Sequence, residues 1–464
     1  MTRILTFILL FASFASVSKS QETQERYRPA FHYSPEKNRM GKLSGLIKLD
    51  DTYHLYFQKN DNNLEDAYYS LAQITSKDLL NWSEEEIVVK SKYMQKKQDG
   101  TIYPGSAIID VNKLSAVSSG ASSILLYYTR IGEGVCMSYS NDAGKTWQEY
   151  SENPILAERS DEKIERPYVF FDESRNKWYM SLSLVEKGSE KRSIEILSTD
   201  NLTDFTSLSK SDLACDNATL LPYNKSDNST AWIVINNNGS YQAIDFDGKS
   251  LSEAGALKWS DNGRTSSSPV FCKLGNVYKS IALMDENFPE MPFRGQSSLP
   301  ADVTVMDKGG DVVMMQRPME ELSAIMQKSK EIKNKLIMPG GKNPFAGVSG
   351  IKLRIKGTVE MRSCNYFTLY TRVHRGSSAA QVMYESEDGK LVSAGNSAAY
   401  PLPGNKIVDF DIIIDKTSME VFANGGEAVV KSLVFSSEAK AVDFVVSVKG
   451  GEAYIKSLII TEIE

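Results

Sequence analysis

Five segments of the chain share one hydrophobic pattern: a short apolar run, a polar turn, and a second run in which apolar and polar residues alternate. The first segment covers residues 43–59, where Tyr53, Leu55 and Phe57 alternate with more polar neighbours. An alternation with a period of two is typical of a half-buried β-strand, so each segment predicts a β-hairpin. The other four segments are residues 104–130, 165–185, 217–237 and 266–285.

The hairpin segments begin roughly 50 to 60 residues apart, a repeat length that is typical of a β-propeller whose blades are four-stranded sheets. Five repeats predict five blades over residues 21–320. A Ser-x-Asp turn followed by an aromatic residue also recurs, at residues 76–82, 140–147 and 198–205. Because a turn repeated in successive blades indicates a structural device, we interpret these motifs as β-turns and not as active sites.

The pattern changes after the last repeat. Residues 320–335 are rich in helix-forming residues, and apolar residues such as Ile325 and Ile332 recur near helical spacing, which predicts a helical linker over residues 321–344. Over residues 345–464, long alternating segments are separated by Gly, Asp and Asn turns, as in a β-sandwich. The sequence therefore predicts an all-β fold, with a five-bladed β-propeller followed by a C-terminal β-sandwich.

The first 20 residues have the features of a secretory signal peptide. Arg3 precedes an apolar run over residues 4–17, and Ser18 and Ser20 form a small-x-small cleavage site. No other apolar run approaches the roughly 20 residues that a membrane-spanning helix needs. We therefore expect an exported protein, secreted or periplasmic, without a membrane span.

The charge of the chain argues against nucleic acid as a partner. The 464 residues carry a formal net charge of -6, and removal of residues 1–20, which hold two basic residues and no acidic one, changes this to -8. Binding to phosphates requires clustered Lys and Arg. We therefore expect no nucleic-acid partner.

Cysteine and histidine are too sparse for a metal site. Zinc ligation requires closely spaced Cys or His, so we expect neither a metal nor another cofactor. His54 lies inside an alternating strand and His32 just before the first blade, and we expect structural roles for both. In an exported chain, either one or two disulfides or buried free thiols are possible. The cysteines are Cys136, Cys215, Cys272 and Cys364.

Several motifs together resemble those of one enzyme family. In chain order they are RPAFHYSP at residues 28–35, YHLYFQ at 53–58, PGSAIID at 104–110, SYSNDAGKTW at 138–147, QRPMEEL at 316–322 and FDIIIDKTSMEVFANGGE at 410–427. In this combination and order they resemble glycoside hydrolase family 32, which comprises the invertases, inulinases, levanases and related β-fructosidases. The resemblance covers residues 28–464 and implies a five-bladed propeller joined to a β-sandwich.

The resemblance also implies retaining hydrolysis of β-fructofuranosides by three acids, and the sequence departs from the family at two of these positions. The family's nucleophilic Asp lies in the motif Met-Asn-Asp-Pro-Asn-Gly, which reads MGKLSG at residues 40–45, so Lys42 stands at the nucleophile. The stabilising Asp of Arg-Asp-Pro is replaced by Arg166, and Glu165 precedes it. A lysine cannot form the glycosyl ester of this mechanism.

The third acid, a Glu that acts as acid and base, corresponds to Asp216 when the comparison is anchored on the following Leu-Leu-Pro, or to Ala214 when it is anchored on Cys215. Asp216 is therefore the one candidate catalytic acid that remains. Retaining hydrolysis requires two carboxyl groups roughly 5 Å apart. Our first hypothesis is a protein that binds fructose-containing oligo- or polysaccharide and has lost most or all of its catalysis.

The residues expected to contact this carbohydrate lie at positions that match the family's pocket or replace its acids. Aromatic rings stack on sugar faces, and polar groups bind sugar hydroxyls. For the two aromatic residues among them, ordinary core packing is the alternative. The expected contact residues are Gln58, Lys42, Tyr103, Asp110, Glu165, Arg166, Phe293 and Arg294.

Two further hypotheses stay open. An active glycosidase of the β-fructofuranosidase or levanase type would need a rearranged acid pair, from Asp216 and Glu165 or from the loop acids Asp61, Asp66 and Asp285. A protein-interaction propeller with a vestigial pocket is also consistent with the sequence, because this fold supports many functions.

Overall fold

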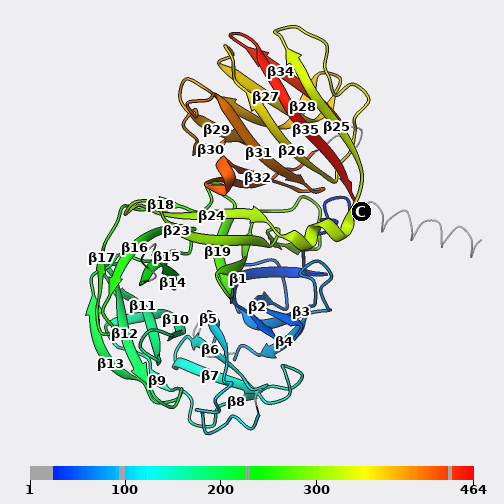
Figure 1. Ribbon diagram of the computed structural model, residues 1–464. Helices are drawn as coiled ribbons and strands as arrows, with labels where there is room; N and C mark the ends of the chain where they lie inside the picture. The colour runs from blue at the N-terminus through cyan, green and yellow to red at the C-terminus, as the bar shows by residue number, and fades with distance from the viewer. Residues whose placement is uncertain (1–24, 93–99, 121, 226, 228, 437–441) are drawn as a thin grey trace, which may run out of the picture.

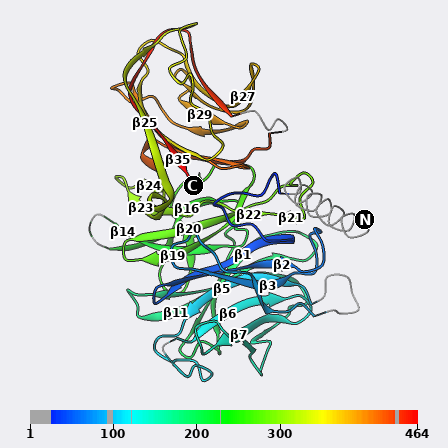
Figure 2. The same cartoon turned by 90° about the vertical axis from the view of Figure 1, so that its right-hand side faces the viewer.

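A computed structural model describes residues 25–92, 100–120, 122–225, 227, 229–436 and 442–464. The predicted signal peptide at residues 1–20 lies outside the described residues. The described chain forms a ring of sheets and, above it, a pair of facing sheets that contains the C-terminus (Figure 1). The view turned by 90° shows the same two parts stacked on each other (Figure 2).

The ring consists of five sheets that follow one another in chain order, one for each hairpin repeat. The first sheet contains β1 (Asn38–Leu49), β2 (Thr52–Asn60), β3 (Ser70–Ser76), β4 (Glu86–Val89) and β21 (Phe293–Arg294). The second contains β5 (Ile102–Ile109), β6 (Ile124–Arg130), β7 (Gly134–Ser140), β8 (Gln148–Glu149) and β9 (Leu156–Ala157).

The remaining three sheets of the ring follow the same plan. The third contains β10 (Glu162–Asp172), β11 (Lys177–Glu186), β12 (Arg192–Thr199) and β13 (Thr206–Ser211). The fourth contains β14 (Thr219–Asn224), β15 (Thr230–Ile235), β16 (Ser240–Phe246), β17 (Leu251–Glu253) and β18 (Lys258–Trp259). The fifth contains β19 (Ser266–Leu274), β20 (Val277–Met284), β22 (Gln296–Ser297), β23 (Ala301–Asp307) and β24 (Val312–Pro318).

The first strand of each sheet lies toward the centre of the ring. β1 contacts β5 and β19, β5 contacts β10, and β10 contacts β14. The ring is closed by β21, which comes from the part of the chain that forms the fifth sheet and pairs in parallel with β1 of the first sheet. The predicted propeller architecture is therefore confirmed.

Four of these first strands are irregular near their starts. A β-bulge holds one residue more than its partner strand, bends the strand and re-aims a side chain, and bulges are frequent beside active sites. The starts of the first strands are therefore the end of the propeller where a site is expected. The register shifts fall between Met40 and Leu43, Tyr103 and Ser106, Ile164 and Arg166, and Ser267 and Val270.

The C-terminal part is a sandwich of two sheets around one apolar core. The six-stranded sheet contains β25 (Met326–Ile337), β26 (Leu353–Glu360), β31 (Ile407–Ile414), β32 (Ser418–Ala423), β33 (Ala428–Leu433) and β35 (Ala453–Ile463). The five-stranded sheet contains β27 (Tyr366–His374), β28 (Ser377–Glu385), β29 (Lys390–Ser393), β30 (Asn396–Ala399) and β34 (Asp443–Lys449). A 3₁₀ helix, η2 (Asn424–Gly426), connects β32 to β33.

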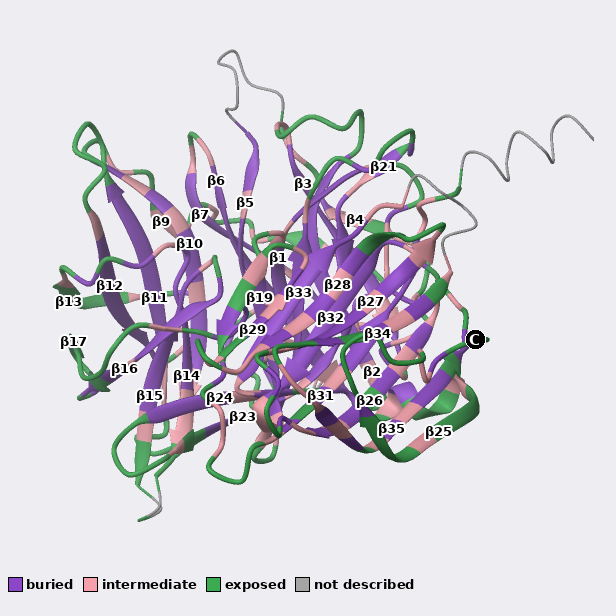
Figure 3. Cartoon of the chain, turned by 90° about the horizontal axis from the view of Figure 1, so that it is seen from above, coloured by how far each residue is buried: buried purple, intermediate pink, exposed green. Residues whose placement is uncertain are grey.

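The predicted helical linker over residues 321–344 is wrong. A short 3₁₀ helix, η1 (Glu320–Ile325), is followed directly by β25, which pairs with β35 at the edge of the six-stranded sheet. This long-range pairing overrides the local helix preference of the segment. β25 is exposed over most of its length (Figure 3), and its lysines protect the edge from pairing with another sheet.

The propeller and the sandwich share one apolar cluster. Phe31, Met319 and Leu322 from the propeller side belong to the same buried cluster as Phe422 and Ile463 of the sandwich. The burial of apolar side chains from both parts holds them together.

His32 lies at this junction, between two carboxylates of the sandwich. Its Nδ1 is 2.8 Å from Asp415 Oδ2 and its Nε2 is 2.8 Å from Glu420 Oε1, and all three side chains are buried. The position agrees with the structural role expected of His32. His54 is likewise buried, within β2. All four cysteines are buried and free, so the disulfide alternative does not hold.

Candidate functional site

Four charged side chains lie near one another at the starts of the first strands, and we call them the axial cluster: Lys42 on β1, Glu165 on β10, Arg192 at the start of β12, and Asp216 just before β14. Arg192 Nη1 donates hydrogen bonds to Glu165 Oε2 at 2.8 Å and to Asp216 Oδ1 at 3.2 Å. The charge of Lys42 acts on Asp216. The axial cluster therefore contains two carboxyl groups and two cations.

The two carboxyl groups of the axial cluster differ in acidity. Burial raises the pKa of Asp216, and the negative charge of Glu165, to which protonated Asp216 donates a hydrogen bond, adds to this, while the charges of Lys42 and Arg192 oppose it. Burial also acts to raise the pKa of Glu165, but the hydrogen bond from Arg192 and the charges of Lys163 and Arg192 bring it below its ordinary value. Glu165 is the stronger acid of the pair, and Asp216 holds a proton more readily.

Tyr103 borders the axial cluster. The Lys163 Nζ lies 4.5 Å from the centre of the Tyr103 ring and 3.3 Å from Glu165 Oε1. An ammonium group over an aromatic face is attracted by the ring's quadrupole. Tyr103 is half-buried and its ring is held beside the cluster by this cation, so two of the expected contact residues, Tyr103 and Glu165, are neighbours in the structure.

Arg166 takes a different place, because its guanidinium is buried at the bulged start of β10. It donates to backbone oxygens of three other blades: from Nε to Gly105 at 3.2 Å, from Nη1 to Asn217 at 3.4 Å and from Nη2 to Ser44 at 3.4 Å. Burial lowers its pKa to about 10, against the opposing charges of Tyr168 and Asp216. Arg166 therefore ties the first strands together, and the prediction that it contacts a ligand is corrected.

Gln58 also serves the scaffold. Its Oε1 accepts a hydrogen bond from the backbone nitrogen of Lys42 at 3.1 Å, and its Nε2 donates to the backbone oxygen of Ile102 at 2.6 Å. The side chain is buried, and both ends of the amide are used. Gln58 positions the backbone of Lys42 and joins the first two blades, which corrects its predicted role as a ligand contact.

Two more predicted contacts lie outside the axial cluster. Asp110 follows the opposite end of β5, where its carboxylate accepts hydrogen bonds from the backbone nitrogens of Leu114 and Ser115 at 2.9 Å and closes a loop. Phe293 is buried, with its ring centre 4.9 Å from that of Phe288. The core-packing alternative therefore holds for Phe293, and Asp110 is a loop residue.

Arg294 belongs to a second ion cluster. Its Nε lies 2.7 Å from Asp285 Oδ1, and the other oxygen of Asp285 lies 2.7 Å from Arg39 Nη2. The same Arg39 nitrogen reaches Asp66 at 3.5 Å. Asp66 and Asp285, two of the loop acids considered for a rearranged pair, are therefore bound to arginine side chains and lie outside the axial cluster.

Sequence reasoning missed Arg192 and Lys163. Neither residue belongs to a family motif quoted above, and basic residues are common on exposed turns. Arg192 enters the axial cluster only because β12 pairs with β11, which in turn pairs with β10. A position of this kind depends on three-strand pairing and leaves no local signal in the sequence.

The fold is shared with solved structures of an exo-inulinase and a fructofuranosidase. The exo-inulinase of Aspergillus awamori superimposes with a TM-score of 0.82 over 94% of this chain and 98% of that structure, at 21% identity. A fructofuranosidase variant from Schwanniomyces occidentalis, solved in complex with fructosylnystose, gives a TM-score of 0.79 over 95% of this chain and 98% of that structure, at 19% identity. These likenesses define the class of fold.

The sequence matches the model of the glycosyl hydrolases family 32 N-terminal domain over residues 32–318 and that of the C-terminal domain over residues 322–462. The levanase of Bacillus subtilis (strain 168) is 27% identical in an alignment that covers 93% of this chain and 70% of the levanase. The extracellular exo-inulinase of Aspergillus awamori is 23% identical, over 89% of this chain and 90% of the relative. The chain belongs to glycosyl hydrolase family 32. Among the described residues, no helix is long and apolar enough to cross a bilayer.

Proposed function

We propose that this protein binds fructose-containing carbohydrate at the axial cluster and that its hydrolytic activity is lost or much reduced. The proposal rests on the position of Arg192. In a retaining glycosidase, two carboxyl groups lie roughly 5 Å apart and flank the scissile bond. Here Glu165 and Asp216 flank a guanidinium nitrogen, to which both are hydrogen-bonded. Both carboxyl groups are therefore engaged by a cation and are not free to act on a glycosidic bond.

Lys42 supports the same proposal. The family resemblance places it at the nucleophile, and its positive charge opposes the oxocarbenium-like transition state of glycoside hydrolysis. Lys42 and Arg192 instead donate hydrogen bonds, which sugar hydroxyls accept. The choice of fructose-containing ligands follows from family membership and from the relative solved with fructosylnystose. Export belongs to this proposal too, since the related exo-inulinase is described as extracellular.

Isothermal titration calorimetry with fructose, 1-kestose and levan fragments tests the proposal, beside an assay for released fructose. We expect binding of at least one of these sugars, with no fructose released above a heat-killed control. The variants Lys42→Met and Asp216→Asn should each weaken binding about tenfold, the effect of one lost hydrogen bond. If none of the sugars binds, the proposal is wrong and a protein-interaction propeller becomes the better explanation.

A second candidate function is an active glycosidase that uses Glu165 and Asp216. One observation favours it: the surroundings lower the pKa of Glu165 and raise that of Asp216, and a split of this kind assigns a nucleophile and a general acid in known glycosidases. This function requires Arg192 to move away when substrate binds. Turnover of a synthetic fructofuranoside that is abolished by both Glu165→Gln and Asp216→Asn would establish it in place of the binder.

A further inference from the structure

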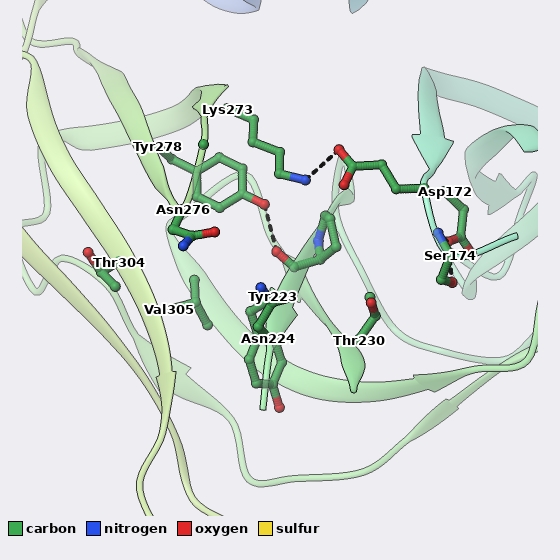
Figure 4. A pocket seen from close by; sticks show the side chains of 13 residues that line it. Asp172, Ser174, Tyr223, Asn224, Thr230, Lys273, Asn276, Tyr278, Thr304 and Val305 are labelled. Carbon is green, nitrogen blue, oxygen red and sulfur yellow. Dashed lines mark hydrogen bonds and ion pairs between the residues drawn. The ribbon is translucent and has the colours of Figure 1, made fainter. Parts of the chain in front are cut away.

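A cavity of about 600 Å³ lies at the other end of the propeller's first strands, among the hairpin turns of the third, fourth and fifth sheets (Figure 4). Asp216 precedes β14, and Tyr223 lies near the end of that strand. At about 3.3 Å per residue, this stretch of chain spans roughly 20 Å. The cavity is therefore separate from the axial cluster.

One wall of this cavity is aromatic. Tyr223 is half-buried, packs against the apolar cluster that the propeller shares with the sandwich, and lines the cavity. Next to it, the backbone oxygen of Pro222 accepts a hydrogen bond from the Tyr278 hydroxyl at 2.6 Å (Figure 4). This bond holds the fourth and fifth sheets together at the cavity. The wall is thus formed by rings whose positions are fixed by packing and hydrogen bonding.

Neutral polar side chains also line the cavity, and four of them have no hydrogen-bond partner among the residues that the structure describes. Asn224, Thr230, Asn276 and Thr304 come from β14, β15, the β19–β20 turn and β23. Over the described part of the chain, the side chains of these four residues make no hydrogen bond. Two amides and two hydroxyls offer both donors and acceptors. Their hydrogen-bonding capacity is available to a ligand.

The charged groups at the cavity are already neutralised in pairs. Lys273 Nζ lies 2.7 Å from Glu173 Oε1, and Asp172 Oδ2 lies 2.6 Å from Arg175 Nη1. A site for phosphate would need unpaired cations, and a site for a metal ion would need unpaired carboxylates. The pairing favours an uncharged ligand over either kind of ion.

We propose that this cavity binds a neutral sugar of one to three residues and forms a second carbohydrate site on the propeller. Its volume is in the range of small-molecule sites. An aromatic wall and unpaired amides and hydroxyls supply the stacking and the hydrogen bonds by which proteins hold sugars. The ligand class is argued from the cavity alone, so this site does not depend on the function proposed for the axial cluster.

Fluorine NMR of protein labelled with 3-fluorotyrosine tests the site, with the Tyr223 resonance assigned from its absence in Tyr223→Phe. We expect that resonance to shift when sucrose or 1-kestose is added, and to shift equally in Asp216→Asn, which alters only the axial cluster. If the Tyr223 resonance stays unchanged up to the solubility limit of both sugars, the cavity is not a sugar site.

Calorimetry with 1-kestose separates this proposal from the function of the axial cluster. In the double variant Tyr223→Ala/Asn276→Ala, the affinity of the cavity for 1-kestose should be at least tenfold weaker. Trp259→Ala is the matched control, because Trp259 is an aromatic residue of the same sheet that is 47% exposed and lies outside the cavity lining. Binding that is lost in Asp216→Asn and intact in the double variant overturns the cavity proposal and leaves the axial one standing. Binding that is lost in the double variant and intact in Asp216→Asn supports the cavity proposal and contradicts sugar binding at the axial cluster.

Discussion

Arg192 binds Glu165 through a 2.8 Å hydrogen bond, although the two residues belong to β12 and β10 and are separated by the strand between them. The same nitrogen reaches Asp216, so one guanidinium connects both carboxyl groups of the axial cluster. A cation in this position reduces the repulsion between two carboxylates. The protonation of the cluster, and whatever it binds, therefore depends on Arg192.

Replacement of Arg192 by Met should raise the pKa of both carboxyl groups. The charge of Arg192 lowers the pKa of Glu165 and opposes the increase at Asp216, so its loss moves both groups in the same direction. The side chains of Arg192 and Asp216 are 31% and 39% exposed, so the free energy of unfolding should change by no more than about 1 kcal/mol. Carboxyl ¹³C NMR titration measures the pKa values.

Lys191→Met is the matched control for this experiment. Lys191 precedes Arg192 but pairs with Asp212, and both of these side chains are largely exposed. The control should leave the titration of Glu165 and Asp216 unchanged. An Arg192→Met protein in which Glu165 titrates as in the wild type would show that Arg192 does not govern the axial cluster.

Arg166→Asp should destabilise the propeller severely. The substitution places a buried carboxylate beside three backbone oxygens that now accept hydrogen bonds, and an uncompensated buried charge costs about 3–5 kcal/mol. Arg166→Met removes the donors without adding a charge and should cost about 1–3 kcal/mol. Urea denaturation gives both values. Equal stability of Arg166→Asp and wild type would show that Arg166 does not stabilise the contacts between the first strands of the propeller.

The same reasoning limits attempts to restore the family's acids. The triple variant Lys42→Asp/Arg166→Asp/Asp216→Glu should show weak hydrolysis at most, because Arg166→Asp disturbs the first strands. Restoring Asn at Gly41 would also force the Tyr69 ring to shift, since a Cβ there would lie 2.8 Å from Tyr69 Cε1. Family-like turnover by the triple variant, measured as fructose release, would show that the site tolerates the acids.

Gln58→Ala should lower the melting temperature. A ligand contact, the role that the sequence predicts for Gln58, would be replaceable without loss of stability. The structure instead predicts a loss of about 1–3 kcal/mol, because the backbone nitrogen of Lys42 and the backbone oxygen of Ile102 lose their partner. Gln148→Ala, at an exposed glutamine of β8, should leave the melting temperature unchanged. An unaltered melting temperature in Gln58→Ala would return Gln58 to a ligand-binding role.

The propeller and the sandwich were predictable because hairpin patterns are local. Residues 43–59 contain both strands of a hairpin and the turn between them, so the period of two is visible within one segment. The helix predicted for residues 320–335 was wrong for the opposite reason. Its partner strand, β35, lies at the far end of the chain, and the local preference for helix gave no sign of it.

The candidate site was predictable where a family motif fixed a position and not where neighbouring strands bring residues together. The motifs indicated Lys42, Glu165 and Asp216 as site positions, and the structure has all three at one end of the propeller. They gave no information on which way Arg166 points, because a bulge re-aims the side chains at that strand start. The place of Arg192 in the axial cluster could not be predicted from the sequence, because it depends on the pairing of β10, β11 and β12.

His32 should make the stability of the protein depend on pH in the alkaline range. Burial acts to lower its pKa, but hydrogen bonds and charges from Asp415 and Glu420 raise it from 6.5 to about 9. Because the folded-state pKa is higher than the unfolded one, the stabilisation is fully present below about pH 6.5. It is lost as the pH rises through about 9, and the shift corresponds to roughly 3 kcal/mol.

Urea denaturation of wild type and His32→Gln between pH 6 and 10 measures this effect. At neutral pH, His32→Gln should lose about 3–5 kcal/mol, because two buried carboxylates lose their cation. It should also lack the part of the alkaline decline that comes from His32, while other groups that titrate there affect both proteins alike. His374→Gln, at a partly buried histidine of β27, should behave as wild type. An identical decline in His32→Gln and wild type would mean that His32 is not the protonated link between propeller and sandwich.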